Sequence, residues 1–500
     1  MNVSGLPQGW QMAALDEVCE VIQGQSPPGD TYNDSGAGIP FFQGKAEFGP
    51  VYPTVVKWCS SPTKIAELDD ILISIRAPVG PTNLCPLQAC IGRGLAAIRP
   101  LGGIPARYIL YALRNSESDL ASRGTGSTFA AVSGAELRSH RITLAPLPTQ
   151  HRIVAEIERQ LTRLDAAVAA LKRIRANLKR YRASVLKAAC EGRLVPTEAE
   201  LARAEGRDYE TGAQLLARIL RERRIAWETQ VPNVRKRKYD EPQPPDTSRL
   251  PELPEGWTWA SVEQVGRLQL GRQRAPKYHQ GQHMRPYLRV QNVFEARIDL
   301  SDVMEMDFPG DDATTYELRS GDILLNEGQS PELLGRPALY RGELPGVCFT
   351  NTLIRFQAAG SLCVEFALIV FRHYMRAGRF AAEGTITTNI AHLSLGRLSL
   401  IEFPLPPLAE QCRIVAEVER RLSVIQDLEE STGLNLRRAD RLQQAILKRA
   451  FEGKLVPQDP NDEPASALLE RIRAEGTSAK QAAGMKRHGG KTRYRRRGKA

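Results

Sequence analysis

The sequence predicts α/β (α+β) globular domains in two copies, separated by two long helices that pack as an antiparallel coiled coil, with a pseudo-two-fold internal repeat. Three observations predict this fold class. The segment QHRIVAEIERQL, residues 150–161, recurs as QCRIVAEVERRL, residues 411–422. Apolar residues follow a helical spacing through both copies of this segment. The stretches before them are instead rich in glycine, proline and short β-like runs such as DDILISI and GDILLNEG.

The repeat extends well beyond this segment in both directions. LKAACEGRLVP, residues 186–196, corresponds to LKRAFEGKLVP, residues 447–457. Near the start of each copy, LPQGW, residues 6–10, corresponds to LPEGW, residues 253–257, and the motifs DDIL and GDIL follow inside the two copies. A unit of about 250 residues is far longer than the roughly 20–50 residues of solenoid repeats, so each copy should be a domain with a connector.

Each repeated segment predicts one long helix. PLP precedes the first helix, and Gly192 and Pro196 follow it, which are typical start and stop signals. Apolar residues three and four positions apart predict a seam that must pack against another helix. The first seam comprises Ile153, Ile157, Leu161, Leu164, Val168, Leu171, Ile174, Leu178, Tyr181 and Val185, and the second comprises Ile414, Val418, Leu422, Ile425, Leu442 and Ile446.

We expect the two long helices to pair with each other in an antiparallel manner. Two matching apolar stripes on one chain have a high effective concentration for each other. The alternative is that each helix pairs with a different protein. EESTG, residues 429–433, interrupts the second seam and predicts a kink or a looser middle in that helix.

These elements divide the chain into six segments. They are residues 1–147 (first globular domain), 148–196 (first long helix), 197–250 (extra helix and linker), 251–406 (second globular domain), 407–457 (second long helix) and 458–500 (short helix and basic tail). In the third segment, GAQLLARILRERRIAWE predicts a helix that we expect to dock a partner. The basic and proline-rich linker after it should be a tether that lets the chain return to begin the second domain.

Composition and charge restrict the class of protein. With 42% hydrophobic and 25% charged residues, the 500-residue chain is typical of a globular protein. No stretch approaches the roughly 18 apolar residues of a membrane helix, and the N-terminus has no signal-like run, so we expect a cytoplasmic protein without membrane contact. The net charge of +11 suggests a polyanionic partner, but residues 480–500 hold nine Lys or Arg and no acidic residue. This tail could grip phosphates or could be a solvated end.

The sequence contains no recognisable catalytic or cofactor motif. Motifs of the NPPY, DPPY and GxGxxG types are missing. GIPFFQGKA, residues 38–46, differs from a P-loop because five residues separate its glycines and Ala46 replaces Ser or Thr. His279 and His283 lack a nearby cysteine or carboxylate, so we expect a polar loop there and not a metal site. The eight cysteines have no zinc-like or redox spacing and should be reduced. We therefore expect no catalytic residue, no metal and no cofactor on this chain.

Two domains held by a helical spacer suit a target with two sites at a fixed distance. Double-stranded DNA is such a target, since half-sites recur on one face at a spacing set by the helical turn of roughly 34 Å. Arg pairs with guanine, Asn or Gln pairs with adenine, and Gly allows the backbone to approach phosphates. The candidate DNA-binding residues are Gln25, Ser26, Gln43, Lys45, Arg76, Thr125 and Ser127 in the first domain and Arg272, Gln273, Arg274, Lys277, Arg289, Gln291, Asn292, Asn326, Thr387 and Asn389 in the second.

The two copies share short segments and diverge between them. We expect the shared segments to form a frame and the divergent segments to carry two different specificities, so the DNA site should be bipartite with unlike halves. The alternative is a non-catalytic coiled-coil adaptor protein without DNA sequence specificity, whose domains bind peptides. A chain that fuses methylation with recognition is disfavoured by the missing motifs.

PLPTQHRIVAEIE and PLAEQCRIVAEVE at the helix starts, together with DDIL and GDIL in the variable domains, resemble the specificity subunit of a Type I restriction-modification system. The resemblance covers residues 5–475. It implies two target-recognition domains of α/β fold, each reading one half of a split DNA sequence across a non-specific spacer.

The resemblance also implies partners and cofactors. The repeated helices would bind two modification (methyltransferase) subunits, which use S-adenosylmethionine to methylate adenine at N6. Restriction subunits would cleave DNA, with ATP and Mg bound on partner subunits and no cofactor on this chain. The stretch 203–249 is longer than a spacer requires, and the basic tail has no counterpart after the first copy. Both features depart from the family pattern.

Overall fold

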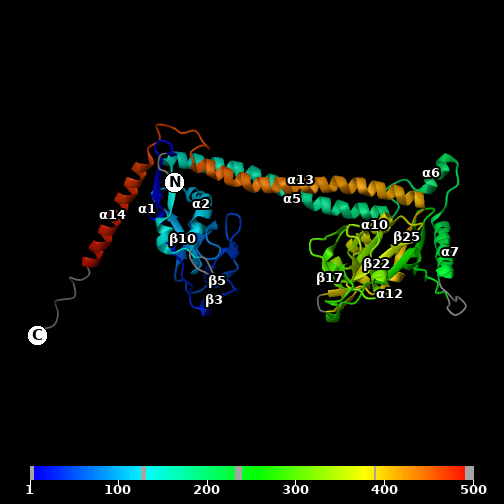
Figure 1. Cartoon of the computed structure of the whole chain (residues 1–500). Helices are drawn as coiled ribbons and strands as arrows, with labels where there is room; N and C mark the ends of the chain where they lie inside the picture. Colours follow the sequence, from blue (N-terminus) through cyan, green and yellow to red (C-terminus); the bar gives the residue numbers. More distant parts are fainter. Residues whose placement is uncertain (1–4, 125–130, 231–238, 388–389, 490–500) are drawn as a thin grey trace. The chain divides into compact units, whose positions relative to one another are not determined.

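The computed structural model describes residues 5–124, 131–230, 239–387 and 390–489. The chain divides into two compact units, and each unit contains one globular domain and one end of each long helix (Figure 1). Unit 1 comprises Met1–Lys172 and Gly433–Ala500, and unit 2 comprises Arg173–Thr432. We call their globular parts domain 1 and domain 2.

Domain 1 is built on an antiparallel sheet in the order β2-β10-β7-β8. A second sheet has the order β3-β5-β4-β9-β6, in which β4 runs parallel to β9, and β1 pairs with β11. The strands are β1 (Gln11–Ala14), β2 (Cys19–Gln23), β3 (Tyr32–Asn33), β4 (Ile39–Phe42), β5 (Lys57–Cys59), β6 (Ile65–Ala66), β7 (Ile71–Ser74), β8 (Thr82–Leu84), β9 (Ala89–Ile91), β10 (Leu95–Pro100) and β11 (Arg141–Leu144).

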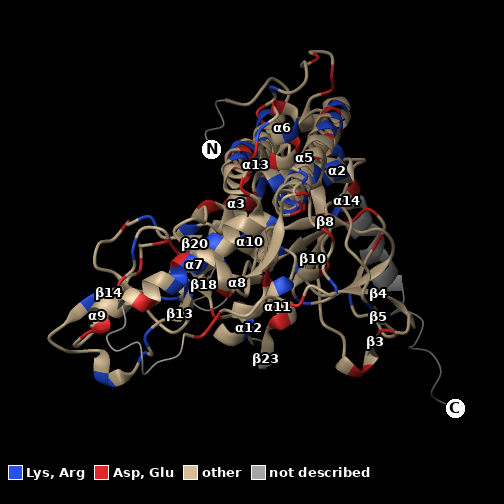
Figure 2. Ribbon diagram, turned by 90° about the vertical axis from the view of Figure 1, so that its right-hand side faces the viewer, with Lys and Arg blue, Asp and Glu red and all other residues tan. Residues whose placement is uncertain are grey.

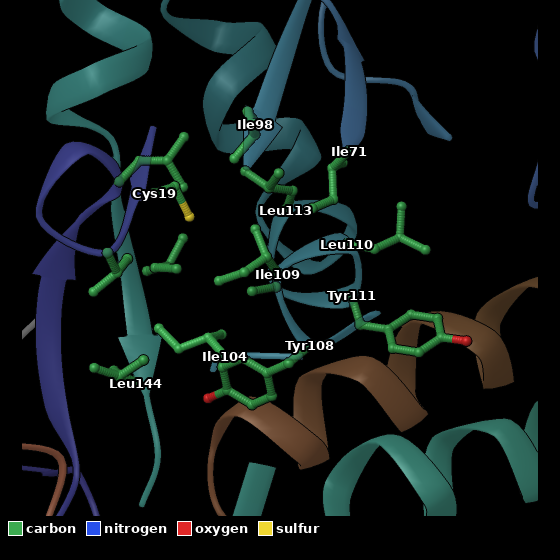
Figure 3. Close-up of a cluster of buried hydrophobic side chains, with 14 of the residues drawn as sticks. Cys19, Ile71, Ile98, Ile104, Tyr108, Ile109, Leu110, Tyr111, Leu113 and Leu144 are labelled. Carbon is green, nitrogen blue, oxygen red and sulfur yellow. The ribbon is translucent and has the colours of Figure 1, made fainter. Parts of the chain in front are cut away.

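Helix α2 forms the centre of the domain 1 core. The helices are α1 (Leu15–Val18), α2 (Ala106–Asn115), α3 (Glu117–Ser122) and α4 (Gly134–Ser139). Helix α2 buries Tyr108, Ile109 and Leu110 completely, and Figure 3 shows these side chains among those of the neighbouring strands. Burying each such side chain contributes roughly 1.5–3 kcal/mol.

Domain 2 repeats this arrangement with a different outer layer. Its antiparallel sheet has the order β13-β22-β18-β20, β12 pairs with β25, and the outer sheet is β17-β14-β21 with β14 parallel to β21. The strands are β12 (Thr258–Ser261), β13 (Gly266–Leu270), β14 (Met284–Leu288), β15 (Val293–Phe294), β16 (Arg297–Ile298), β17 (Met304–Asp307), β18 (Asp322–Asn326), β19 (Gly328–Gln329), β20 (Pro337–Leu339), β21 (Cys348–Phe349), β22 (Leu353–Ala358), β23 (Thr385–Thr387), β24 (Ile390–His392) and β25 (Glu402–Leu405). The helices are α8 (Val262–Val265), α9 (Asp312–Tyr316), α10 (Val364–Arg376), α11 (Arg379–Glu383) and α12 (Leu395–Leu400).

The DDIL and GDIL motifs begin the equivalent strands β7 and β18. Their aspartates, Asp70 and Asp322, are buried at 2% and 3% exposure. Each carboxylate accepts a hydrogen bond from the backbone N–H three residues earlier, at 2.8 Å from Glu67 and 2.9 Å from Arg319. The motif therefore fixes the turn that enters the central sheet, which explains why both copies contain it.

The glutamine of the repeated QxRIVAE segment closes the turn that leads into each long helix. Gln150 donates a hydrogen bond to the Ala145 carbonyl at 2.8 Å, and Gln411 donates one to the Pro406 carbonyl at 3.0 Å. Both glutamines are fully buried. Because a buried amide must find partners, this position tolerates few other residue types.

The long helices α5 (Leu147–Cys190) and α13 (Leu408–Phe451) are antiparallel, as the sequence predicts. In unit 1, Ile153 and Ile157 near the start of α5 share one apolar cluster with Ile446 near the end of α13. In unit 2, Val185 near the end of α5 shares a cluster with Ile414 near the start of α13. Each unit thus combines the start of one helix with the end of the other.

Helix α13 is continuous over its 44 residues, including residues 429–433, where we expected a kink or a looser middle. The expected looser packing is present in both helices. Leu428 and Leu434 are 47% and 54% exposed, and the predicted seam residues Ile174 and Tyr181 of α5 are 44% and 46% exposed. Ile425 near the middle of α13 is nonetheless fully buried, so exposed and buried apolar residues both occur in the middle of the helices.

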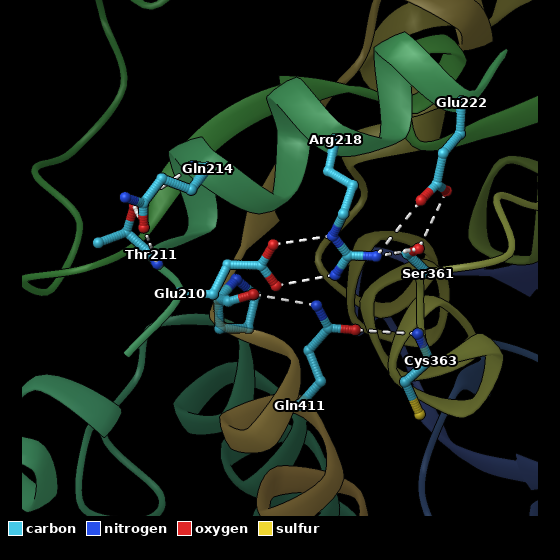
Figure 4. Close-up of polar contacts among 9 residues, drawn as sticks. Glu210, Thr211, Gln214, Arg218, Glu222, Ser361, Cys363 and Gln411 are labelled. Carbon is cyan, nitrogen blue, oxygen red and sulfur yellow. Dashed lines mark hydrogen bonds and ion pairs between the residues drawn. The ribbon is translucent and has the colours of Figure 1, made fainter. Parts of the chain in front are cut away.

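Helix α7 (Gly212–Gln230) packs against its own unit. Leu215 and Ile219 are buried in the core cluster of unit 2. Arg218 pairs with Glu210 at 2.8 Å and also contacts the Ser361 hydroxyl, as Figure 4 shows. These two apolar residues of α7 are therefore occupied within the chain, and docking of a partner by this helix stays a prediction for its exposed face. Two further helices, α6 (Glu198–Glu205) and α14 (Ala465–Gly489), follow α5 and α13.

Candidate nucleic-acid interface

Two loops cross closely at one end of the central sheet of domain 1. The Gly24 N–H donates to the Leu95 carbonyl at 2.9 Å, and the Gln25 N–H donates to the Ile91 carbonyl at 3.0 Å. A Cβ atom on Gly24 would lie 2.2 Å from the Gly92 carbonyl oxygen. Only glycine fits this place, which we call the loop crossing of domain 1.

Domain 2 contains the same loop crossing at equivalent positions. The Gly271 N–H donates to the Leu353 carbonyl at 3.1 Å, and the Arg272 N–H donates to the Phe349 carbonyl at 3.1 Å. A Cβ atom on Gly271 would lie 2.2 Å from the Thr350 carbonyl oxygen. The two copies therefore bring the same two loops together although the loop sequences differ.

Four predicted residues gather at the loop crossing of domain 1. They are Gln25, Ser26, Gln43 and Arg76, and all except the half-buried Ser26 are exposed. Ser26 Oγ accepts a hydrogen bond from the Arg93 N–H at 3.4 Å. Gln43 and Arg76 directly follow residues 42 and 75, whose backbones bond to Gly92 and Gly94 at 2.8 and 3.0 Å. Lys45 is exposed and begins a short 3₁₀ turn two residues after Gln43.

A pocket of about 400 Å³ adjoins this crossing. It is lined by Gln23, Gly24, Ile75, Arg76, Arg93, Ala131, Val132 and Ser133. The sequence predicted only Arg76 among these residues. Arg93 was missed, although its place between Gly92 and Gly94 marks it as a side chain on a tight turn.

Several predicted residues cannot be placed in this way. Thr125, Ser127 and Asn389 lie outside the described residues. Thr387 is the last residue of β23, and its side chain is also outside the described part of the chain.

In domain 2, Arg272 is buried, so its guanidinium does not face a surface. Its side chain lies 3.8 Å from the centre of the Tyr278 ring, and Nε lies 2.9 Å from Asp312 Oδ2. The exposed fraction of Arg272 is 6%. It fixes the segment that follows the loop crossing, and we leave it out of the DNA-contacting set.

Asn292 and Asn326 are also buried. Asn292 accepts a hydrogen bond from the Arg289 N–H at 3.0 Å and donates to the carbonyls of Asp299 and Asp302 at 3.0 and 2.9 Å. Asn326 is completely buried, and within the described residues its side-chain amide has no hydrogen-bond partner. Asn292 has a structural role in its turn, and neither asparagine presents an amide to a ligand at the surface.

The remaining predicted residues of domain 2 lie on the segment after the crossing. Gln273, Arg274, Lys277 and Gln291 are exposed. Arg274 lies over the Tyr287 ring at 5.6 Å, and Lys277 Nζ lies 4.9 Å from the centre of the Tyr278 ring. Arg289 is mostly buried and pairs with Asp302. These aromatic contacts hold cationic side chains at the surface in defined places.

A Ser–His–Asp grouping in domain 1 does not form a catalytic site. Ser116 Oγ lies 2.8 Å from His140 Nε2, but His140 Nδ1 is 4.0 Å from Asp119 Oδ2, which is beyond hydrogen-bond distance. His140 is 1% exposed, and burial together with nearby Arg123 lowers its pKa. The Ser116 hydroxyl also donates to the Ala112 carbonyl at 3.1 Å. The group closes the end of α2.

The described residues contain no cluster of three or more His, Cys, Asp or Glu side chains placed to hold a metal ion. All eight cysteines are free thiols. Among the described helices, none combines the length and the apolar character that crossing a membrane requires.

Comparison with known proteins shows which protein family this chain resembles. The model of the family described as "Type I restriction modification DNA specificity domain" matches residues 7–180. The StySPI specificity subunit of Salmonella potsdam is 23% identical over 95% of this chain and 97% of its own length. The EcoKI specificity subunit of Escherichia coli (strain K12) gives the same identity and the same two shares. The resemblance to type I specificity subunits thus extends over nearly the whole chain.

A further relative and two solved structures show the same resemblance. A protein of Methanocaldococcus jannaschii named "Putative type I restriction enzyme MjaX specificity subunit" is 38% identical over 160 residues, and the match spans 31% of this chain and 38% of that relative. The solved HsdS subunit from Thermoanaerobacter tengcongensis has the same fold, with a TM-score of 0.50 and 18% identity over 90% of this chain and 98% of that one. A chain from the structure described as "Structural basis underlying complex assembly and conformational transition of the type I R-M system" has a TM-score of 0.59 and 18% identity, covering 90% and 99%.

The similarity to type I specificity subunits supports a role in DNA sequence recognition, and the adaptor alternative is not favoured. Specificity subunits are non-catalytic, which agrees with the structural role of the Ser116 and His140 contact. The loop crossings are therefore the candidate surfaces for DNA.

Proposed function

We propose that this specificity subunit reads a bipartite, asymmetric DNA site, with one half contacted by each domain. The observation that carries the proposal is the pair of loop crossings. The same backbone contacts occur in both domains, at Gly24 and Gly271, yet the exposed side chains around them differ in type and position. A common frame with different surface residues is what two unlike half-sites require.

The proposed contacts combine phosphate and base recognition. In domain 1 they are Gln25, Ser26, Gln43, Lys45 and Arg76, with Thr125 and Ser127; in domain 2 they are Gln273, Arg274, Lys277, Arg289 and Gln291, with Thr387 and Asn389. The cationic side chains would bind phosphates and guanine, and the amides would bind adenine. Each phosphate contact would make the affinity more dependent on salt.

We further propose that α5 and α13 set the spacing between the half-sites and dock two modification subunits. Basic and acidic residues are interspersed along the sequences of both helices, and Figure 2, which views the helices end-on, shows both kinds of residue on them. Several apolar side chains on these helices are exposed. These are Ile174, Tyr181, Val424, Leu428, Leu434 and Leu442. In this proposal the modification subunits methylate adenine N6 with S-adenosylmethionine, restriction subunits use ATP and Mg, and the complex acts in the cytoplasm.

The test is DNA selection with the full chain bound to its modification subunits, followed by sequencing of methylated DNA from cells that contain the same complex. The expected result is a split motif with adenine methylation in both halves. Variants in domain 1, such as Gln43→Ala with Arg76→Ala, should change one half only. Selection that yields no motif, or a motif without a spacer, would contradict the proposal.

A further inference from the structure

The pocket of domain 1 has an equivalent position in domain 2. Val132 donates its N–H to the Ile75 carbonyl at 3.0 Å, and Leu393 donates its N–H to the Glu327 carbonyl at 2.8 Å. Ser133 and Ser394 then cap the equivalent helices α4 and α12. These contacts match the pocket lining of domain 1 to domain 2 residue by residue.

In domain 1 the pocket is cationic. Arg76 and Arg93 both line it together with Gln23. Both arginines are exposed, and neither has an ion-pair partner among the residues that the structure describes. An arginine without a carboxylate keeps its full set of donors for a ligand.

In domain 2 the same position carries a carboxylate. Glu327 stands where domain 1 has Ile75, and His392 stands where domain 1 has Ala131. His392 Nδ1 lies 3.2 Å from Glu327 Oε1, and the side chain of Glu327 is 26% exposed. Asn351 occupies the place of Arg93. Gly328 occupies the place of Arg76, because it pairs with His392 as Arg76 pairs with Ala131. The lining thus changes from two arginine donors in domain 1 to a carboxylate acceptor at a neighbouring position in domain 2.

These two chemistries suit different bases. The guanidinium fork donates two parallel hydrogen bonds to guanine O6 and N7, which is the commonest specific contact to DNA. A carboxylate cannot bind phosphate, because the two charges repel, but it accepts a hydrogen bond from the amino group of cytosine. A carboxylate at this place therefore indicates a contact to a base and excludes a contact to the DNA backbone.

We propose that the pocket of domain 1 and the matching region of domain 2 each select one base: Arg93 with Arg76 recognises a guanine in the half read by domain 1, and Glu327, oriented by His392, recognises a cytosine in the half read by domain 2. The inference rests on the proposed function. It names the residues and the bases that make the two halves unlike.

The experiment measures relative affinity for every base at every position of both half-sites, using the full chain with its modification subunits. Arg93→Gln should lower the preference for guanine at one position of one half by roughly 5- to 150-fold. Arg93→Lys keeps the charge but loses the fork, so it should lower the same preference while preserving the overall affinity. Glu327→Gln should relax cytosine at one position of the other half and favour adenine, to which an amide can pair.

Arg138→Gln is the matched control, because Arg138 is an exposed arginine of α4 outside the pocket lining. It should leave the base preference at every position unchanged. Thermal unfolding of each variant checks that the fold is intact.

The outcomes separate the two proposals. A split motif in the wild type with an unchanged base preference in Arg93→Gln and Glu327→Gln would overturn this inference alone. A uniform loss of affinity for all sequences in Arg93→Gln, with a salt slope smaller by about one, would identify a phosphate contact and also overturn it. A wild-type complex without any sequence preference would overturn the proposed function and this inference together.

Discussion

At the loop crossing of domain 1 the residue after the glycine is the exposed Gln25, whereas the equivalent Arg272 of domain 2 is buried between Asp312 and Tyr278. The backbone contacts are the same in both places. In domain 2 this arginine connects the 3₁₀ turn of residues 276–278 with the start of α9, whereas the matching 3₁₀ turn of domain 1, residues 29–31, follows the exposed Gln25. The same frame position can thus serve the surface in one copy and the interior in the other.

The comparison shows where the two copies are free to differ. The central sheet, the buried aspartates and the crossing glycines keep the same contacts. The outer sheet changes from the order β3-β5-β4-β9-β6 in domain 1 to β17-β14-β21 in domain 2. Because the outer layer is packed by its own small apolar clusters, it can change without disturbing the core of either unit.

The largest expected effect is a loss of stability that differs between substitutions of the two buried aspartates. Asp322→Ala leaves Arg355 unpaired at 5% exposure, which should cost about 3–5 kcal/mol. Asp70→Ala should cost only about 1–3 kcal/mol, because the side chain of its partner Arg99 is 35% exposed and can be hydrated. Hydrogen exchange of β18 and β7 amides measures both losses. Asp34→Ala, an exposed site, is the control, and equal losses in the two domains would contradict the comparison.

The next effect concerns the residue after the crossing glycine. Arg272→Ala removes an ion pair at 2.9 Å and a stacking contact at 3.8 Å, so we expect a loss of about 2–3 kcal/mol. Gln25→Ala should change the stability by less than about 0.5 kcal/mol, because the side chain is exposed. Urea unfolding followed by limited proteolysis of each domain distinguishes them. A destabilised Gln25→Ala would show that the two positions are more alike than their burial indicates.

Substitution of either crossing glycine should reduce stability by a similar amount. In Gly24→Ala and Gly271→Ala, the new methyl group would meet a backbone carbonyl oxygen at 2.2 Å, so each substitution should cost about 1–3 kcal/mol. Gly29→Ala and Gly360→Ala are matched controls with no atom within 4 Å of the new Cβ. Thermal melting of the four variants gives the comparison. A large effect in one domain only would mean that the crossings are not equivalent.

Much of the fold could be predicted because the chain is repeated. The matched segments identify the two copies, and the helical spacing identifies α5 and α13. Helix α13 continues through residues 429–433, since a single Gly433 inside a long helix costs only about 1 kcal/mol and does not end it. The sequence also does not reveal which surface receives Leu215 and Ile219 of α7, which pack in the core of unit 2.

The site could be predicted only in part. Polar residues beside glycines point to the loops, and in domain 1 those loops do meet. The same pattern fails for Arg272, Asn292 and Asn326, because a residue type does not show whether its polar group is used inside the domain. Arg93 and Glu327 were missed, since only the contacts of the folded chain show that both lie around equivalent places in the two copies, Arg93 at the position of Asn351 and Glu327 at the position of Ile75.

The smallest expected effect comes from a titratable group that only domain 1 contains at this place: His140 stands where domain 2 has Ile401 at the end of the equivalent helix. Burial and Arg123 lower the folded pKa of His140, while Asp119 opposes this shift. The unfolded chain therefore binds more protons below about pH 6.5, and the stability of domain 1 should fall as the pH decreases from about 7 to 5.

His140→Ile should reduce this slope by at most about 1.4 kcal/mol per pH unit. His373 in domain 2 is also partly buried with a lowered pKa, so the comparison is made between the variant and the wild type, using urea midpoints at each pH. Identical slopes would mean that His140 gains no proton on unfolding, and the difference between the two domains would then have no consequence for acid stability.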